Sequence, residues 1–180
     1  MASLAKFFAA MAAASLLAQA TGASAQAPRC VTEQEVSAIA IYSVPSLVQA
    51  VRLRCASELA SSGYIARRGD ALSARYVALQ PAVWPRAKSG LLKLFAGAAS
   101  ESRSGLDTIT TLPDDAVRPL VDALIVQESA PRIALRNCTR IERVVEAMAP
   151  LDPEVAGTLL GVLVGFADSE QIPVCPARRA

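Results

Sequence analysis

Apolar residues recur every three or four positions along most of this chain, which is the spacing of a helix with one buried face. The clearest stripes are Leu47, Val48, Val51, Cys55 and Leu59, and Ile141, Val144, Val145 and Met148. No segment alternates apolar and polar residues convincingly enough to indicate a strand, and no internal repeat is visible. The pattern therefore predicts an all-α fold.

Two helix starts carry a capping-box pattern, in which a hydroxyl side chain and a glutamate three residues later satisfy free amides of the first turn. Thr32 and Glu35 form the first pattern, and Thr139 and Glu142 form the second. Asp152, which precedes a proline, is expected to cap the last helix. Helices are therefore expected to begin at these three points.

Prolines divide the helical segments, because proline lacks an N–H and clashes with the preceding turn. We expect Pro45 to end one helix and to begin a second over roughly 45–60, and Pro119 to kink a helix or start a new one. The short spacings around Pro45 and from Pro150 to Pro153 favour antiparallel helix hairpins. The expected architecture is a single-domain bundle of six to eight helices.

The N-terminal residues have the three-part layout of a secretory signal peptide. Lys6 lies in a short positive region, Phe7–Ala18 is uncharged, and Ala23-Ser24-Ala25 supplies the small residues that a signal peptidase accepts. The apolar run is shorter than the roughly 20 residues of a membrane span. We expect cleavage after Ala25, so that residues 1–25 are removed and residues 26–180 form one domain; the alternative is a helix retained in the mature chain.

The mature chain is expected to be soluble and outside the cytoplasm. Arg29 directly precedes Cys30, whereas a lipid-modified cysteine follows a small residue, so neither a lipid anchor nor stable membrane insertion is expected. The Ala- and Arg-rich composition favours a bacterial source, and hence a periplasmic or secreted protein.

The four cysteines, Cys30, Cys55, Cys138 and Cys175, all follow the predicted cleavage site. An even number in an oxidising compartment predicts two disulfides, with three possible pairings. Helix hairpins favour the pairs Cys30–Cys55 and Cys138–Cys175, because each hairpin returns its second cysteine toward its first. If Pro45 only kinks one long helix, Cys30 and Cys55 lie over about 30 Å apart and cannot pair.

The charge balance excludes a strongly basic nucleic-acid binder, since the formal net charge is only +2. The charge is uneven, however. Residues 26–100 carry nine basic and four acidic side chains, whereas residues 101–180 carry eight and twelve. Either the two halves compensate on packing, or a basic surface meets an anionic envelope component or an acidic protein. The residues of that surface would be Arg52, Arg54, Arg67, Arg68, Arg75, Arg86 and Lys88.

The chain has no histidine, which removes the usual general base, the Ser-His and Cys-His nucleophiles and the commonest zinc ligand. We expect no cofactor, no metal and no catalytic residue. A histidine-free hydrolase or lyase of envelope polymers, using carboxylates, is the alternative. Its candidate carboxylates are Glu101, Asp107, Asp114, Asp115 and Glu128. The Glu-Ser pairs at Glu101 and Glu128 resemble that of lytic transglycosylases, but the glycine- and glutamine-containing motif of that family does not follow them.

Gly157, Gly161 and Gly165 are spaced by four in the last helix and form a flat strip that another helix can approach closely. The uncharged run around them, Val155–Ala167, is too short to cross a bilayer. The strip is expected to pack inside the bundle; the alternative is a homodimer face.

Together these observations predict a protein that works by binding in the bacterial cell envelope, as an inhibitor, interaction partner or accessory. Self-association through the glycine strip, as a structural protein, is a further alternative. The segment 100–111 is polar and without helical period, and is the best candidate for a partner-facing loop.

Overall fold

The chain is helical through nearly all of the part that the structure, a computed structural model, describes: residues 30–97, 110–166 and 173–175. The all-α prediction is confirmed. The described residues form six α-helices: α2 (Glu33–Arg54), α3 (Tyr64–Val77), α4 (Gln80–Gly97), α6 (Asp114–Ser129), α7 (Cys138–Met148) and α8 (Pro153–Phe166). Two short 3-10 helices, η1 (Ala130–Arg132) and η2 (Leu135–Asn137), connect α6 to α7. The predicted signal peptide and most of the 100–111 segment lie outside the described residues.

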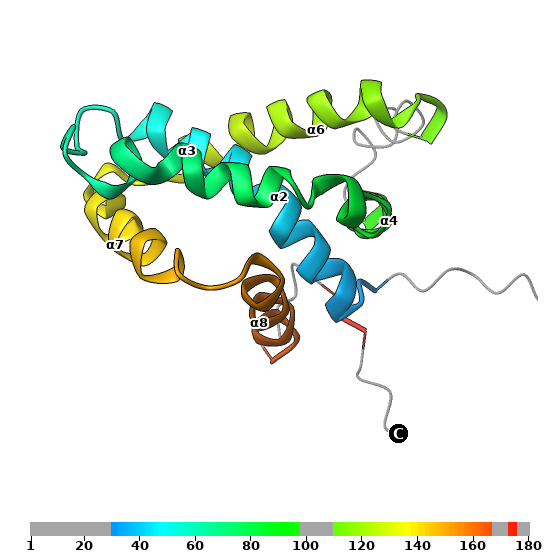
Figure 1. Ribbon diagram of the computed structural model, residues 1–180. Coiled ribbons are helices and arrows are strands. Elements are labelled where there is room, and N and C mark those ends of the chain that lie inside the picture. The colour runs from blue at the N-terminus through cyan, green and yellow to red at the C-terminus, as the bar shows by residue number, and fades with distance from the viewer. Residues whose placement is uncertain (1–29, 98–109, 167–172, 176–180) are drawn as a thin grey trace, which may run out of the picture.

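Helix α2 is the centre of the bundle. Helices α3, α4, α6 and α8 all pack against it, and α7 packs against α3 (Figure 1). Side chains around most of its circumference are buried, among them Ile41, Tyr42, Val48 and Val51. A helix that is apolar on several faces needs this many neighbours, and the rest of the fold is arranged to supply them.

The prediction of a helix break at Pro45 is wrong, because α2 runs without interruption through it for 22 residues. Pro45 has no N–H for the carbonyl of Ile41, the residue one turn before it. The next carbonyl along, that of Tyr42, accepts a hydrogen bond from the Gln80 side chain at 3.0 Å. Pro85 and Pro119 likewise lie inside α4 and α6. Burial against neighbouring helices outweighs the local cost of each proline.

The capping box predicted at Thr32 and Glu35 is confirmed, and both of its hydrogen bonds form. Glu35 is almost buried, and its carboxylate also accepts hydrogen bonds from Ser89 and Lys93 of α4, each at 2.7 Å. Burial raises the pKa of Glu35, but the hydrogen bonds from Lys93, Thr32 and Ser89 outweigh it and lower the pKa from 4.5 to about 2. This charged cluster ties the start of α2 to α4.

The depressed pKa of Glu35 predicts a loss of stability in acid. Its carboxylate stabilises the fold fully above pH 4.5, and this contribution disappears as the pH falls through about 2. Glu35→Gln is expected to lower the free energy of unfolding by about 3 kcal/mol at pH 7 and to flatten its pH dependence below pH 4.5. Urea unfolding at pH 7, 4 and 3 measures both effects. The exposed Glu33→Gln is the matched control, and equal acid dependence in the two variants contradicts the assignment.

Both disulfides are formed, but the favoured pairing is wrong: Cys30 pairs with Cys175, and Cys55 pairs with Cys138. The uninterrupted α2 is the reason, because it separates Cys30 from Cys55 by its whole length. The Cys30–Cys175 bridge closes beside a backbone bridge between Val31 and Val174. The Cys55–Cys138 bridge joins the end of α2 to the start of α7 and is fully buried. Two disulfides indicate an oxidising compartment.

The predicted hairpin between the last two helices is also wrong, since α8 packs along α2 rather than back on α7. The glycine strip is the contact surface, as the prediction of core packing required. A Cβ at Gly157 would lie 2.5 Å from Cγ1 of Ile41, and one at Gly161 would lie 2.6 Å from the carbonyl oxygen of Glu33. Asp152 caps α8 as predicted, accepting from the amide of Glu154 at 2.9 Å.

The second capping box, at Thr139 and Glu142, does not form. Helix α7 begins at Cys138, one residue before Thr139, and has no side-chain cap. Glu142 instead accepts a hydrogen bond from the backbone N–H of Ile65 at 3.0 Å, in the first turn of α3. The residue before α3 is Gly63, which has no side chain to cap with. Glu142 therefore supplies from α7 the cap that α3 lacks.

Helix α2 is also the one helix among the described residues that is long and apolar enough to cross a membrane, with a mean hydropathy of 1.4 over its most apolar window. Of that window, 44% is buried inside the protein. Core helices of soluble proteins have the same length and composition, so this observation carries no argument for a membrane span.

Candidate functional site

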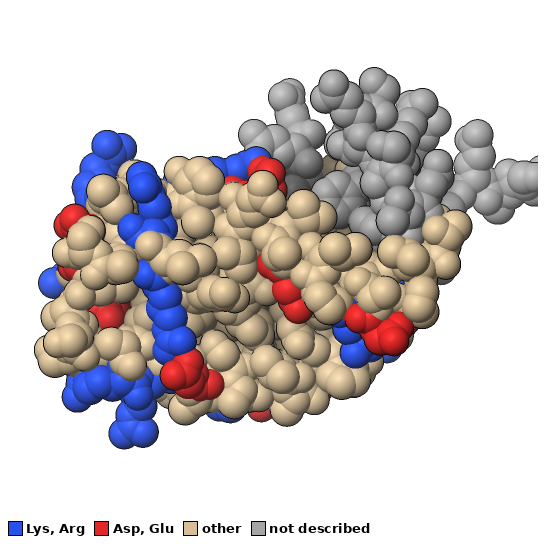
Figure 2. Space-filling model, turned by 90° about the horizontal axis from the view of Figure 1, so that it is seen from above, with Lys and Arg blue, Asp and Glu red and all other residues tan. Residues whose placement is uncertain are grey.

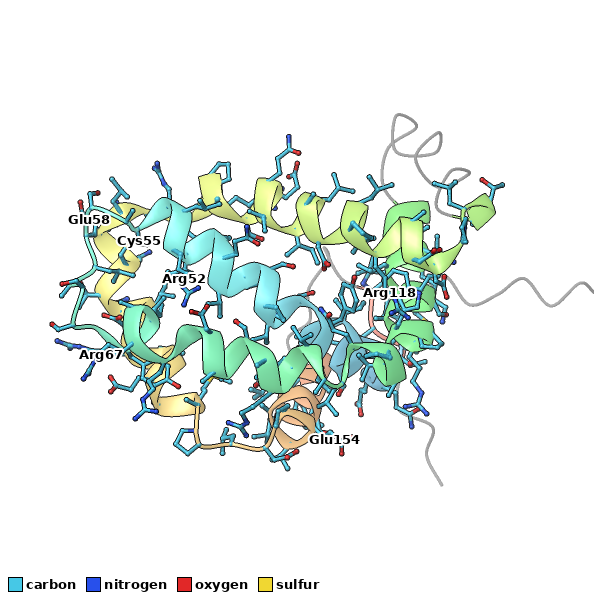
Figure 3. All side chains as sticks on the ribbon, turned by 45° about the horizontal axis from the view of Figure 1, so that its top comes forward. Arg52, Cys55, Glu58, Arg67, Arg118 and Glu154 are labelled. Atoms are coloured by element: carbon cyan, nitrogen blue, oxygen red, sulfur yellow. A yellow bond between two sulfur atoms is a disulfide. The ribbon has the colours of Figure 1, made fainter. Side chains whose placement is uncertain are left out.

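Two clusters of buried apolar side chains lie on different sides of α2. The first joins α2, α4 and α6 around Trp84, whose ring centroid lies 4.9 Å from that of Tyr42. The Arg118 guanidinium lies over the Trp84 ring, 5.4 Å from its centroid, and Figure 3 shows Arg118 at this side of the molecule. Both aromatic side chains are almost inaccessible to solvent. Large aromatic side chains fill the core on this side of α2.

The second cluster joins α2, α3 and α7, and it is hollow. A cleft of about 310 Å³ opens between these helices and the segment that follows α6. Its floor is α2, which contributes Val44, Leu47, Val48 and Val51 at the i, i+3, i+4, i+7 spacing of one helix face. Leu47 is 40% exposed, so solvent or a ligand reaches this floor from outside. We call this hollow the apolar cleft.

The walls of the apolar cleft come from two other helical faces. Helix α3 contributes Ile65, Leu72 and Tyr76, and α7 contributes Ile141, Val145 and Met148. The α7 residues are three of the four in the predicted apolar stripe. The fourth, Val144, is 52% exposed and faces away from the cleft.

Polar groups are scarce in the apolar cleft. Among the residues that line it, only Ser129 and Tyr76 carry a polar side-chain atom. Burial raises the pKa of the Tyr76 hydroxyl, so this group is neutral and able to donate at ordinary pH. No side chain of the lining is charged. The cleft is therefore suited to an apolar guest rather than to acid–base chemistry.

Of the candidate carboxylates that the structure describes, Glu128 lies apart from Asp114 and Asp115. Asp114 and Asp115 lie at the start of α6, where Asp114 accepts from Lys88 at 2.8 Å. Glu128 lies near the other end of α6 and pairs with Arg132 at 3.0 Å. Glu101 and Asp107 lie outside the described residues. Within the described ranges, no three His, Cys, Asp or Glu side chains form a group able to hold a metal ion.

The predicted basic surface is divided by the fold. Arg86 and Lys88 lie on α4. Arg86 lines a cleft with Glu33, at the start of α2, and Lys88 pairs with Asp114 of α6. The other members lie on α3 and at the end of α2, where Arg52 pairs with Asp70 and Arg54 donates to the carbonyl of Ile133. Figure 2 shows Lys and Arg side chains gathered at the end of the molecule that carries α3 and α7. Four exposed arginines of the acidic second half join them there: Arg132, Arg136, Arg140 and Arg143.

Two further surface features are present. A second cleft, of about 390 Å³, lies between α2, α4 and α8 and carries the opposite charges of Glu33, Arg86 and Glu154. Figure 3 places Glu154 on α8, far from Cys55 at the end of α2. The side of α8 opposite the glycine strip is apolar and exposed, up to 82% at Phe166. Because the strip faces α2, this opposite side is the one that α8 offers to other molecules.

The sequence patterns predict only part of the lining of the apolar cleft. The apolar faces of α2 and α7 are visible as stripes, but the contributions of α3 and of Ile133, after η1, are not.

No family model matches this chain, and no similar protein is found among curated proteins or solved structures.

Proposed function

We propose that this protein is exported from a bacterial cell, loses residues 1–25 by cleavage after Ala25, and works in the periplasm or outside the cell by binding rather than by turnover. The signal-peptide layout of the N-terminal residues supports export. The two disulfides, which indicate an oxidising compartment, support it independently.

The ligand that we propose is a small apolar molecule or a single hydrocarbon chain, held in the apolar cleft. The observation that carries this proposal is a hollow of about 310 Å³ in which every lining residue except Ser129 and Tyr76 is apolar. Ligand pockets in proteins usually measure about 300–1,000 Å³, so this one suits a small guest. A methylene group needs about as much room as a water molecule, roughly 30 Å³, so the cleft holds about ten of them.

The size of the cleft limits the affinity. Each methylene group moved out of water contributes about 0.8 kcal/mol, so ten contribute about 8 kcal/mol. Immobilising the chain opposes this gain. Because 8.2 kcal/mol corresponds to a dissociation constant of about 1 μM, we expect binding at micromolar concentrations or weaker. Such an affinity fits a carrier or sensor that exchanges its ligand.

The test fills the apolar cleft from α7. N-phenyl-1-naphthylamine, which fluoresces when it leaves water, is titrated into the mature chain. Val145→Trp places a large ring in the cleft and is expected to weaken probe binding at least about ten-fold, the effect of losing about 1.4 kcal/mol. Val144→Trp, on the neighbouring and exposed position of the same helix, is expected to leave binding unchanged.

Equal probe binding by these two variants contradicts the proposal. Helical circular dichroism is measured for both, to verify that each is folded. If Val145→Trp does not fold, Leu47→Trp fills the cleft from the partly exposed floor and is held to the same expectation.

A further inference from the structure

The apolar cleft has a cation fixed at its edge. The Nε of Arg54 donates to the carbonyl oxygen of Ile133 at 3.2 Å, and Ile133 lines the cleft. This bond holds the guanidinium beside the lining, although Arg54 itself is exposed. Among the described residues, no hydrogen bond or ion pair engages the two terminal nitrogens of Arg54. Arg54 is therefore positioned by one donor and keeps its outer donors available.

A second arginine at the cleft differs from Arg54 in this respect. Arg75 donates through one terminal nitrogen to the carbonyl of Ala149 at 2.6 Å and through the other to that of Leu151 at 2.8 Å. Ala149 also lines the cleft. Both terminal nitrogens of Arg75 are thus engaged in holding the end of α7. Its role is structural, and Arg54 is the edge cation with donors to offer.

The surroundings of Arg54 favour an anion. Arg132 and Arg136 flank Ile133 along the chain, and both are exposed. Arg132 already has a partner in Glu128, whereas Arg136 has no ion pair with a described residue. The nearest acid along the chain is Glu58, in the turn that follows α2, and its carboxylate accepts from Ser57. Glu142 also lies at this edge, but its carboxylate accepts from the backbone N–H of Ile65. Arg54 and Arg136 are therefore cations near the cleft that form no ion pair with a described acid.

We propose that the ligand of the apolar cleft is an anionic amphiphile: an unbranched chain of about ten carbons with a single carboxylate or phosphate head. The chain lies along the Val44, Val48 and Val51 face of α2, and the head accepts from the terminal nitrogens of Arg54. A guanidinium fork matches both kinds of head, because each presents two oxygens to two parallel N–H donors. This inference rests on the proposed function and adds the headgroup to it.

The test compares three ligands of equal chain length by calorimetry with the mature chain at pH 7.5: decanoate, decyl phosphate and 1-decanol. A charge-assisted hydrogen bond contributes about 1.5–3 kcal/mol, so the anionic ligands are expected to bind at least about ten-fold more tightly than the alcohol. The tighter of the two anions identifies the head. Arg54→Gln is expected to abolish the difference while leaving the affinity for decanol unchanged.

Arg86→Gln, on α4 and at the other cleft, is the matched control and is expected to keep the full difference. The headgroup assignment is overturned if wild-type protein binds decanol as tightly as decanoate, or if Arg54→Gln retains the preference for anions. If none of the three ligands binds, the proposed function itself is overturned. The decanol measurement therefore separates the two failures.

Discussion

Replacing both Cys55 and Cys138 by alanine is expected to lower the free energy of unfolding by about 5 kcal/mol, the largest single effect that this fold predicts. The bridge spans 83 residues of sequence, and closing a loop of that length in the unfolded chain contributes about 4.5 kcal/mol by chain entropy. Both cysteines are fully buried in the cluster that contains Ile65 and Leu72, so their removal also leaves a cavity. Urea unfolding of the wild type and the double variant measures the difference.

The other bridge provides the comparison. Cys30 and Cys175 are 145 residues apart, so chain entropy alone predicts an equal or larger loss when they are replaced. They are only partly buried and join two short segments at the edge of the fold. We expect the Cys30→Ala, Cys175→Ala variant to lose less stability than the Cys55→Ala, Cys138→Ala variant. The reverse order shows that loop length, not burial, decides the contribution of each bridge.

The local features of this fold could be predicted from the sequence, because their partners are a few residues away. The Thr32–Glu35 box and the Asp152 cap each involve atoms within one helical turn. The continuity of α2 through Pro45 could not, because it depends on four helices that pack around it. That one difference also changed the disulfides. A helix broken at Pro45 would return Cys55 toward Cys30, whereas the unbroken α2 keeps these two cysteines apart at its two ends.

Glu142 caps a helix, as its sequence pattern predicts, but the amide that it binds belongs to a different helix. Its position predicts a carboxylate that caps a helix start, and it does cap one, but the amide belongs to Ile65, 77 residues away. The amide that a carboxylate finds depends on which helices meet, and a single sequence does not contain this.

The apolar cleft, too, could be predicted only in part from the sequence. The stripes on α2 and α7 predict two faces that need burial. Whether facing stripes interdigitate or leave about 310 Å³ open depends on side-chain volumes summed across several helices. The contact between Arg54 and Ile133, 79 residues apart, is equally invisible in the sequence. The sequence therefore contains the chemistry of the site but not its assembly.

Gly161→Leu is expected to lower the free energy of unfolding by about 3 kcal/mol, at the upper end of the usual cost of overpacking. A Cβ at Gly161 would lie 2.6 Å from the carbonyl oxygen of Glu33, which is backbone in the first turn of α2. This oxygen cannot move aside as a flexible side chain can. The two helices must therefore separate, which exposes buried residues such as Ile41 and Ala156. Thermal and urea unfolding measure the loss.

Gly165→Leu is the matched control on the same strip. Its Cβ would lie 3.2 Å from the Glu33 carboxylate, the far end of a side chain that can rotate away, so a loss below about 1 kcal/mol is expected. A glycine strip that served a second copy of the chain would behave differently. Gly161→Leu would then leave the melting temperature of the monomer unchanged and lower the mass of a dimer in light scattering. Stability and mass together thus test the packing of this face of α8 against α2.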